Sequence, residues 1–405
     1  MIKQWLNVRS LIPKDDLQEI YKYENINEYL KYHPSTVVEH AKSTDRWIDI
    51  PKKVLELYQM VGRRTPLFRA YQLEKLLKTS NKIYLKREDL LSNGSFKITS
   101  ALPQAYYGAL EGKKNVITET GAGQTGVAAA LAARLNDLAC TVFMVRTSHK
   151  LKKLRCLMME AYGADVIASP SEQTSSGRLL LSSGEINGSI AFATSEVMER
   201  ICEEPKSFNI AGSLLDFVLT YNTTVGLETV IQLNEKKIEP DIVIGCVGGG
   251  SSFGGFALPL LNHYKSNLDR IICAESRSIP TLTRGIYDYD YPDGEGQGNK
   301  LLMYSLGYDF KPPAMHASGL RYHAASPIVS YFVNKGIVEA KSYDEKKAML
   351  SAIEFARTEG ILISPESSYT IQAIKQMCQE YENKNIVAVI TGNGQLDLES
   401  YGEFL

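Results

Sequence analysis

Short apolar runs recur along this chain, and a helical pattern follows most of them. Strands that are apolar on both faces are typical of parallel sheets covered by helices. Strands that alternate with helices indicate βαβ units, and therefore parallel strand pairing. The predicted strands span residues 82–86, 115–120, 140–145, 165–168, 241–247, 271–275 and 385–390. The pattern thus predicts an α/β fold.

The helical patterns and the prolines divide the rest of the chain. We expect an extended segment over 64–70, because Pro66 disfavours a helical conformation in the residue before it. Residues 1–60 are polar and rich in tyrosine, with prolines between short helical candidates, and we interpret them as a covering layer. The main predicted helices span residues 71–78, about 101–112, 127–135 and 150–162.

Composition limits the kind of protein this chain can form. It has 405 residues, of which 44% are hydrophobic, so a two-lobed protein is expected rather than one core. The formal net charge of -1 gives no electrostatic reason to bind nucleic acid. No apolar run approaches the roughly 18 residues of a membrane span, and no signal-peptide core stands at the N-terminus. We therefore expect a cytoplasmic protein that does not bind membranes.

The cysteines give no sign of a metal site. The chain has 6 cysteines, none of them in a C-x-x-C pair, and most have apolar neighbours. Zinc sites typically show paired cysteine or histidine ligands at short spacing. We expect buried thiols in a reducing compartment and no bound metal.

Lys97 is the first residue that suggests a particular chemistry. It lies in the stretch Ser92–Thr99, just before a predicted helix. A lysine in that position is ordinarily a solvated charge. Two glycine-rich loops downstream change the interpretation, because each joins a predicted strand to a predicted helix and can bind an anion on its backbone amides. A lysine with two such loops is typical of enzymes that hold pyridoxal phosphate as a Schiff base.

The first loop, Gly121–Gly126, allows two interpretations. It fits the G-x-G-x-x-G fingerprint of dinucleotide-binding proteins, which place an acidic residue at the end of the next strand. That strand ends here in Arg146, which could meet a ribose phosphate, so an NADP-dependent oxidoreductase stays open. Alternatively, the loop amides could bind a substrate carboxylate while Glu119 exchanges protons with it or its neighbour.

The second loop, Gly248–Ser252, favours a phosphate. Three consecutive glycines leave several backbone N–H groups free to converge on one anion, and two serines add hydroxyls. No Gly-Lys-Ser or Gly-Lys-Thr sequence follows, so a nucleoside triphosphate is poorly supported. The loop therefore suits a phosphate monoester.

Several polar residues elsewhere have both structural and functional interpretations. The charged segment Lys86–Asp89 is either a solvated strand end or part of the site near Lys97. We expect His323 to be a structural histidine. Glu366 lies in the first turn of a predicted helix, where the helix dipole favours a carboxylate. Thr391 follows the last strand, at the end where ligands usually bind in α/β sheets.

Taken in order, these motifs resemble those of a tryptophan synthase β-chain. They are most similar to the second, longer group of such chains, often described as tryptophan synthase β-like pyridoxal phosphate enzymes. The resemblance runs from about Arg63 to Tyr401. The motifs are Gly94-Ser-Phe-Lys97, Glu119-Thr-Gly-Ala-Gly-Gln124, Cys246-Val-Gly-Gly-Gly-Ser251, Gly319-Leu-Arg-Tyr-His323, Glu359-Gly-Ile with Pro365-Glu-Ser-Ser368, and Thr391-Gly-Asn-Gly394.

The resemblance implies fold-type II, with two lobes that each contain a largely parallel sheet flanked by helices. The N-terminal lobe would comprise residues 1–60 and 96–212, with a mobile subdomain over about 112–200. The C-terminal lobe, residues 61–95 and 213–405, would bind the cofactor phosphate. A homodimer is expected, and an α-type partner subunit stays open.

The resemblance also implies the roles of the site residues. Lys97 would form the Schiff base, and Glu119 would be the acid/base residue that assists loss of the β-substituent and deprotonates the incoming nucleophile. Arg321 would pair with an anionic leaving group such as phosphate. The other cofactor-binding residues would be Gly248, Gly249, Gly250, Ser251 and Ser252 at the phosphate, Glu366 near the ring and Thr391 at the pyridine nitrogen. The other substrate-binding residues would be Thr120, Gly121, Ala122, Gly123, Gln124 and Thr125.

The chain departs from the β-chain pattern at Phe96, Thr125 and Tyr369, where that pattern usually has histidine or, at position 125, histidine or a large aromatic residue. Thr391 and the Gly-Ser-Phe-Lys motif look more like threonine synthase and related dehydratases. A hydroxyl at Thr391 does not hold the pyridine nitrogen protonated, which favours β-elimination chemistry. The cofactor is therefore better specified than the nucleophile.

We therefore expect a pyridoxal phosphate-dependent lyase that performs β-replacement or β-elimination on L-serine or an O-activated serine. Formation of tryptophan from indole is the leading activity. The alternatives are another nucleophile, a threonine synthase-like β,γ-reaction, an NADP oxidoreductase, and a catalytically silent homologue that binds a ligand or partner.

Overall fold

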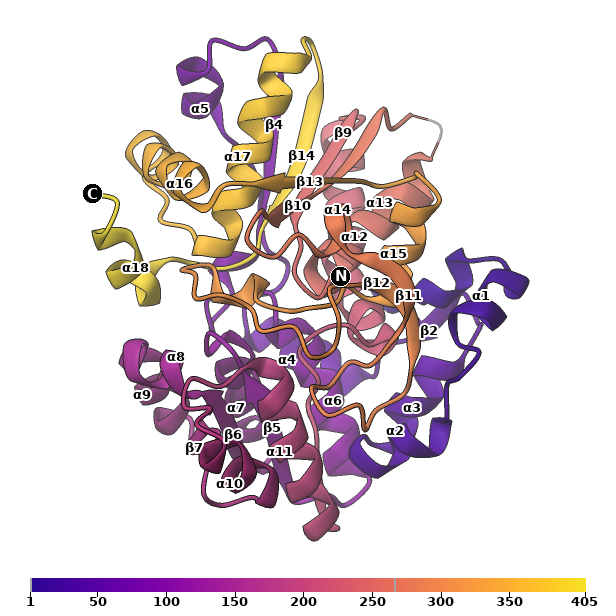
Figure 1. Cartoon of the computed structure of the whole chain (residues 1–405). Coiled ribbons are helices and arrows are strands. Elements are labelled where there is room, and N and C mark those ends of the chain that lie inside the picture. The colour runs from indigo at the N-terminus through magenta and orange to yellow at the C-terminus, as the bar shows by residue number, and fades with distance from the viewer. Residues whose placement is uncertain (1, 266) are drawn as a thin grey trace.

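The computed structural model describes residues 2–265 and 267–405. Within these residues two main sheets form, both flanked by helices (Figure 1). The larger sheet has the order β13-β10-β9-β14-β4-β3 and the smaller one β7-β6-β5-β8. All neighbouring strands in them are parallel except β3 and β4, so the prediction of parallel α/β sheets is confirmed.

The strands of both sheets lie close to the predicted ranges. The larger sheet contains β3 (Leu67–Arg69), β4 (Lys82–Arg87), β9 (Ile242–Cys246), β10 (Arg270–Ser276), β13 (Glu339–Tyr343) and β14 (Asn385–Ile390). The smaller sheet contains β5 (Asn115–Thr120), β6 (Ala139–Val145), β7 (Ala164–Ser169) and β8 (Ser207–Phe208). Two antiparallel pairs lie outside the sheets: β1 (Gln4–Leu6) with β2 (Trp47–Asp49), and β11 (Ile286–Asp290) with β12 (Leu301–Ser305).

Helices surround both sheets. Those that belong to the smaller sheet's part of the chain are α6 (Ile98–Leu110), α7 (Gln124–Arg134), α8 (Arg146–Leu151), α9 (Lys153–Ala161), α10 (Ser175–Ser182) and α11 (Ile190–Glu203). The others after the N-terminal layer are α5 (Tyr71–Leu76), α12 (Asp216–Lys236), α13 (Ser251–Tyr264), α14 (Thr281–Arg284), α15 (Pro327–Asn334), α16 (Glu345–Glu359), α17 (Pro365–Glu380) and α18 (Leu398–Gly402).

The first 60 residues form the covering layer that the sequence predicts. Three of its helices begin directly after Pro13, Pro34 and Pro51, where the fixed φ of proline and its missing N–H suit a helix start. Trp5 is fully buried, and its ring lies 4.6 Å from that of Tyr221 on α12. The helices of the layer are α1 (Lys14–Ile20), α2 (Ile26–Tyr32), α3 (Ser35–Lys42) and α4 (Lys52–Met60).

The helix predicted over residues 150–162 is observed only from Lys153 to Ala161. Lys152 interrupts it with φ -110° and ψ 55°, so α8 ends at Leu151 and α9 begins at Lys153. The Lys152 ammonium lies 2.5 Å from the carboxylate of Asp397, which also pairs with Arg155. The break thus places two cations of this segment against one buried carboxylate near the C-terminus.

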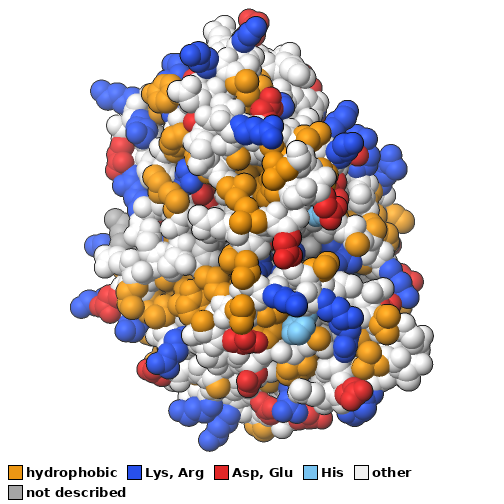
Figure 2. Space-filling model, turned by 90° about the vertical axis from the view of Figure 1, so that its left-hand side faces the viewer, with side chains coloured by type: hydrophobic (Ala, Val, Ile, Leu, Met, Phe, Trp, Pro, Cys, Tyr) orange, Lys and Arg blue, Asp and Glu red, His pale blue; other side chains and the backbone are white. Residues whose placement is uncertain are grey.

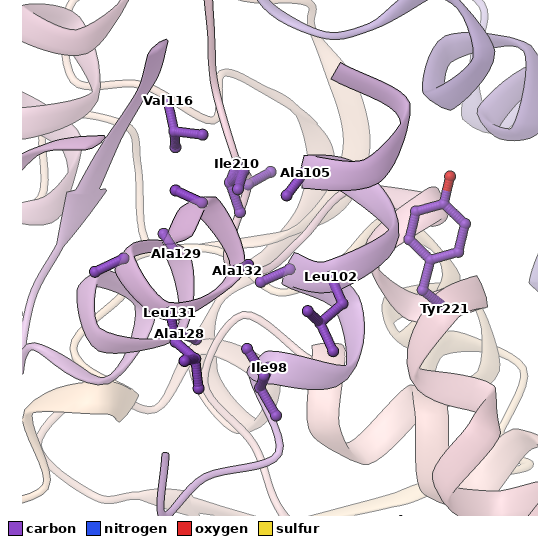
Figure 3. Packing of buried hydrophobic residues seen from close by; sticks show 14 of the residues in the cluster. Ile98, Leu102, Ala105, Val116, Ala128, Ala129, Leu131, Ala132, Ile210 and Tyr221 are labelled. Carbon is purple, nitrogen blue, oxygen red and sulfur yellow. The ribbon is translucent and has the colours of Figure 1, made fainter. Parts of the chain in front are cut away.

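Small side chains let α6, the helix after Lys97, pack closely against α7. In Figure 3, Ala128 and Ala132 of α7 lie toward Ile98 and Leu102 of α6. All four are buried, and alanine allows two helices to approach closely while still removing apolar surface from water. This packing fixes the direction in which α6 leaves Lys97.

The charged segment Lys86–Asp89 fits neither of its two interpretations, because Lys86 and Glu88 are fully buried and line no described cavity. Arg63 lies between two carboxylates, with Nη2 2.8 Å from Glu88 and Nε 3.1 Å from Glu228. The Lys86 ammonium also lies 2.8 Å from Glu228. Burial alone would raise the pKa of Glu228, but Arg63 and Lys86 together hold it below its ordinary value.

The surface carries charges of both signs, and most of the thiols are buried. On the face drawn in Figure 2, Lys and Arg side chains are interspersed with Asp and Glu. Cys202 is exposed and Cys378 half-buried, so the expectation of buried thiols fails at these two positions and holds at the other four. No helix within residues 2–265 or 267–405 is both long and apolar enough to cross a membrane.

The buried ion pairs give the first testable prediction. Glu228→Gln should lower the free energy of unfolding by about 3–5 kcal/mol, because it leaves Arg63 and Lys86 with less compensation in a buried site. Glu235→Gln, further along α12, removes an exposed pair with Arg64 and should cost at most about 1 kcal/mol. Urea unfolding of both variants measures the difference. Equal losses would contradict the importance of the buried network.

Candidate active site

The carboxyl ends of β5, β9 and β14 meet at one cavity. Its volume is about 780 Å³, including the solvent at its mouth. Parallel sheets commonly bind ligands at this end of their strands. The cavity brings together almost all the predicted site residues: Lys97, Glu119, Thr120, Gly121, Ala122, Gln124, Thr125, Gly248, Gly249, Gly250, Ser251, Ser252, Glu366 and Thr391.

Lys97 stands immediately before α6 and faces this cavity. Its position is fixed by Phe96, whose N–H donates to the carbonyl of Thr391 at 3.0 Å. The Lys97 ammonium donates to the carbonyl of Gly212 at 3.0 Å. Desolvation lowers the pKa of Lys97 to about 8, against the opposing charges of Glu366 and Glu119. The neutral, nucleophilic amine of Lys97 is therefore far more populated near neutral pH than that of an ordinary lysine.

The glycine loop after β9 leaves no room for side chains. A Cβ on Gly248 would lie 2.9 Å from the carbonyl oxygen of Gly319, and Gly250 adopts φ +95°. The backbone can therefore approach an anion closely, and α13 begins at Ser251, so its positive end faces the loop. The loop fits a phosphate monoester, as the sequence predicts.

Glu119, the penultimate residue of β5, also lines the cavity. Burial raises the pKa of its carboxyl, while hydrogen bonds from the backbone and from Asn209, and the charge of Lys97, lower it. The net result is a pKa above the ordinary value for glutamate. The protonated form of this carboxyl, which can donate a proton, is therefore more accessible than that of an ordinary glutamate.

Gln124 and Glu366 connect the two sides of the cavity. Gln124 Nε2 donates to Glu366 Oε2 at 3.0 Å, and the N–H of Gly319 donates to Glu366 Oε1 at 2.8 Å. The hydroxyl of Ser95 donates to Gln124 Oε1 at 3.3 Å. The carboxylate of Glu366 is therefore held in place by two separate segments, and Ser95 from a third segment bonds to Gln124.

Thr391 presents a hydroxyl to the same cavity. Its Oγ1 lies 2.9 Å from the Ser367 hydroxyl, and its N–H donates to that hydroxyl at 3.0 Å. Ser367 belongs to the first turn of α17, so the start of this helix fixes the orientation of Thr391.

Two predicted substrate residues do not line the cavity. Gly123 lies behind its loop, where an added Cβ would be 2.8 Å from the Arg155 side chain. Arg321 donates to the carbonyl of Pro312 at 2.9 Å and borders a smaller cavity, which shares Gly121 with the main one. Desolvation lowers the pKa of Arg321, and no carboxylate of the described residues lies within 4.0 Å of it.

A second chamber of about 800 Å³ adjoins the first, and sequence reasoning missed it. The two share Glu119, Ile190, Ser213 and Tyr322. Apolar side chains of α11 line one wall of the chamber, and tyrosines of α2 line another. The apolar positions of α11 are also what a helix packed in an ordinary core would show, so the sequence carried no separate signal for a chamber. The residues from these helices are Ile190, Val197, Met198, Ile201, Tyr29 and Tyr32.

Together these residues fit pyridoxal phosphate. The Gly248–Ser252 loop would hold its phosphate, Lys97 its aldehyde carbon, and Thr391 its ring nitrogen. The desolvated amine of Lys97 and the close backbone approach at Gly248 are the features that carry this fit. Within the described residues no group of three or more His, Cys, Asp or Glu side chains is arranged to hold a metal ion.

Comparison with known proteins supports the same cofactor and fold. Residues 58–392 match the family described as pyridoxal-phosphate dependent enzyme, which favours this cofactor over NADP. The solved structure of a threonine deaminase from T.th. has a TM-score of 0.64 at 20% identity, covering 85% of this chain and 98% of that one. That likeness supports the fold alone.

Closer sequence relatives are tryptophan synthase chains from archaea. Tryptophan synthase beta chain 2 of Methanothermobacter thermautotrophicus is 42% identical over all of this chain and 96% of its own length. The tryptophan synthase beta chain of Pyrobaculum aerophilum is 42% identical over the full length of both. That of Pyrococcus horikoshii is 40% identical over all of this chain and 90% of its own. This chain therefore belongs to the fold-type II pyridoxal phosphate-dependent enzymes and, among them, to the tryptophan synthase β-chain-like family.

Proposed function

We propose that this enzyme replaces the hydroxyl of L-serine with a carbon nucleophile, and that it forms tryptophan from serine and indole. The observation that carries the proposal is the position of Glu119, where the cavity with Lys97 opens into the apolar chamber. The names of the full-length relatives support the same reaction.

Bound pyridoxal phosphate supplies an electron sink that makes loss of the α-proton and of the β-substituent feasible. Lys97 would hold the cofactor through its neutral amine and then be free to carry a proton within the cavity. The loop Thr120–Gln124 would orient the serine carboxylate on its amides, since α7 begins at Gln124 with its positive end toward the cavity.

Glu119 would handle the two remaining protons. In its acid form it donates a proton to the departing serine hydroxyl, which then leaves as water. In its base form it accepts the proton that the nucleophile loses. Burial raises the pKa of Glu119, which makes its acid form more accessible than that of an ordinary glutamate.

The apolar chamber would bind the nucleophile. Its α11 wall removes a flat hydrocarbon from water, which favours indole over a small polar nucleophile. Phe96 and Thr125 also line the main cavity, so the departures at these positions lie at the reacting end of the site. Another planar nucleophile, or a threonine synthase-like reaction, is the alternative.

The activity can be tested directly. The purified enzyme with pyridoxal phosphate, L-serine and indole should form tryptophan. Glu119→Ala should lower kcat about 10²–10⁴-fold, because it removes the acid/base group. Glu172→Ala, at an exposed position, should leave the rate unchanged. Turnover of serine without tryptophan would contradict indole as the nucleophile, and no turnover of serine would contradict the reaction.

We also propose that an anionic leaving group would be accepted, because Arg321 is a half-buried guanidinium without a carboxylate partner among the described residues. It does not line the main cavity, but it borders the smaller cavity that shares Gly121 and Ile190 with the main one. Arg321→Met should lower kcat/KM for O-phosphoserine at least tenfold and leave that for serine nearly unchanged, since only the phosphate gains from a paired cation. Steady-state rates with both substrates measure this. Equal losses for the two substrates would show that Arg321 is structural.

The pKa of Lys97 predicts how cofactor uptake depends on pH. Only the unprotonated amine attacks an aldehyde, so the rate of uptake by the apoenzyme should rise with pH and level off above about 8. Visible absorbance after mixing with pyridoxal phosphate follows the reaction. Lys97→Ala should give no band, whereas Lys346→Ala at an exposed position should behave as wild type. A rate that still increases through pH 10 would contradict the lowered pKa.

A further inference from the structure

Asn209 connects the N-terminal layer to Glu119. It follows β8, and its N–H donates to the carbonyl of Tyr32 at 2.7 Å. Its side-chain Nδ2 donates to the carbonyl of Ile117 and to Glu119 Oε2, each at 3.1 Å. Asn209 is buried, its backbone N–H is bonded to α2, and its side chain is bonded to β5.

The orientation of the Asn209 amide follows from its neighbours. A backbone carbonyl and a carboxylate are both acceptors, so the NH₂ end must face them. Both amide hydrogens are then used, one on Ile117 and one on Glu119. The bond to Ile117 prevents the amide from rotating away, so the donor stays directed at Glu119 Oε2.

His33, directly after α2, contacts the backbone carbonyl of Asn209. Its Nδ1 lies 3.2 Å from the carbonyl oxygen of Asn209. Burial lowers the pKa of His33 to about 4, so the ring is neutral, and Nδ1 must carry the hydrogen because a carbonyl cannot donate. His33 thus donates to Asn209, and its ring packs edge-on against Phe217 at 5.2 Å.

We propose that Asn209 is a positioning residue for the acid/base carboxyl of Glu119, and that the N-terminal layer acts on the reaction through His33 and Asn209. This inference rests on the proposed role of Glu119. It gives residues 1–60 a part in the chemistry beyond covering the core.

The proposal predicts a direction for the pH dependence. Three groups face Glu119: the ammonium of Lys97, the amide of Asn209 and the phenol of Tyr322. Lys97 and Asn209 favour the charged carboxylate, while burial opposes it. Burial, followed by nearby carboxylates including Glu119, raises the pKa of Tyr322, so the phenol stays neutral. Without Asn209 the pKa of Glu119 therefore rises further, and the base form is populated only at higher pH.

Serine elimination tests this without any nucleophile. In that reaction serine loses water, and the released enamine takes up water to give pyruvate and ammonia. Asn209→Leu has nearly the same shape and cannot donate. Elimination uses the acid form of Glu119, so this variant should move the basic limb of the pyruvate rate upward by about one pH unit, with an about tenfold higher rate than the wild type above the wild-type limb. His33→Phe should move the limb in the same direction by less.

The control is Asn115→Leu. Asn115 lies at the other end of β5, and its Nδ2 donates to the carboxylate of Glu204 at 3.2 Å, away from the cavity. Its pH profile should match that of the wild type. Cofactor absorbance of all variants should also be unchanged, because none of them contacts Lys97.

The possible failures are distinguishable. A lower rate in Asn209→Leu with an unmoved basic limb would overturn the inference, since a purely structural role produces that result. A wild-type profile for both Asn209→Leu and His33→Phe would also overturn it. If Glu119→Ala itself leaves pyruvate formation unchanged, the acid/base role fails, and the inference fails with it.

Discussion

The buried ion pairs of Arg63 with Glu88 and Glu228 are the constraint on which the site depends. Arg63 also donates to Thr99, two residues after Lys97, so one guanidinium joins the turn directly after β4, α12 and the first turn of α6. Separating these charges inside the protein would leave a buried charge unpaired. The network therefore fixes the junction of the two sheets and, with it, the point from which Lys97 enters the cavity.

Burial shifts the pKa values of the two reactive groups, Lys97 and Glu119, in opposite directions. Desolvation lowers the pKa of Lys97 and raises that of Glu119, and each charge partly offsets the effect on the other. One group becomes a nucleophilic amine and the other a carboxyl that can donate a proton. The same low-dielectric cavity thus prepares the residue that would hold the cofactor and the residue that would move protons.

The sequence predicted the parts of the structure that depend on local pattern. Apolar strands and glycine loops have short-range signals, so the sequence predicted the sheets and singled out Lys97 and the loop Gly248–Ser252, which line one cavity. The break at Lys152 was missed because its partner, Asp397, is distant in the sequence. The same reason applies to the second chamber and to the bond between Asn209 and Glu119, since both arise only when separate elements pack together.

The central claim is that Lys97 holds pyridoxal phosphate, and chemical trapping tests it most directly. Borohydride reduction of the cofactor-loaded enzyme makes the bond between lysine and cofactor permanent, and peptide mass mapping then locates it. The structure predicts one phosphopyridoxyl group, on the peptide that contains Lys97. A label on another lysine, or a loaded enzyme with no label after reduction, would contradict the account.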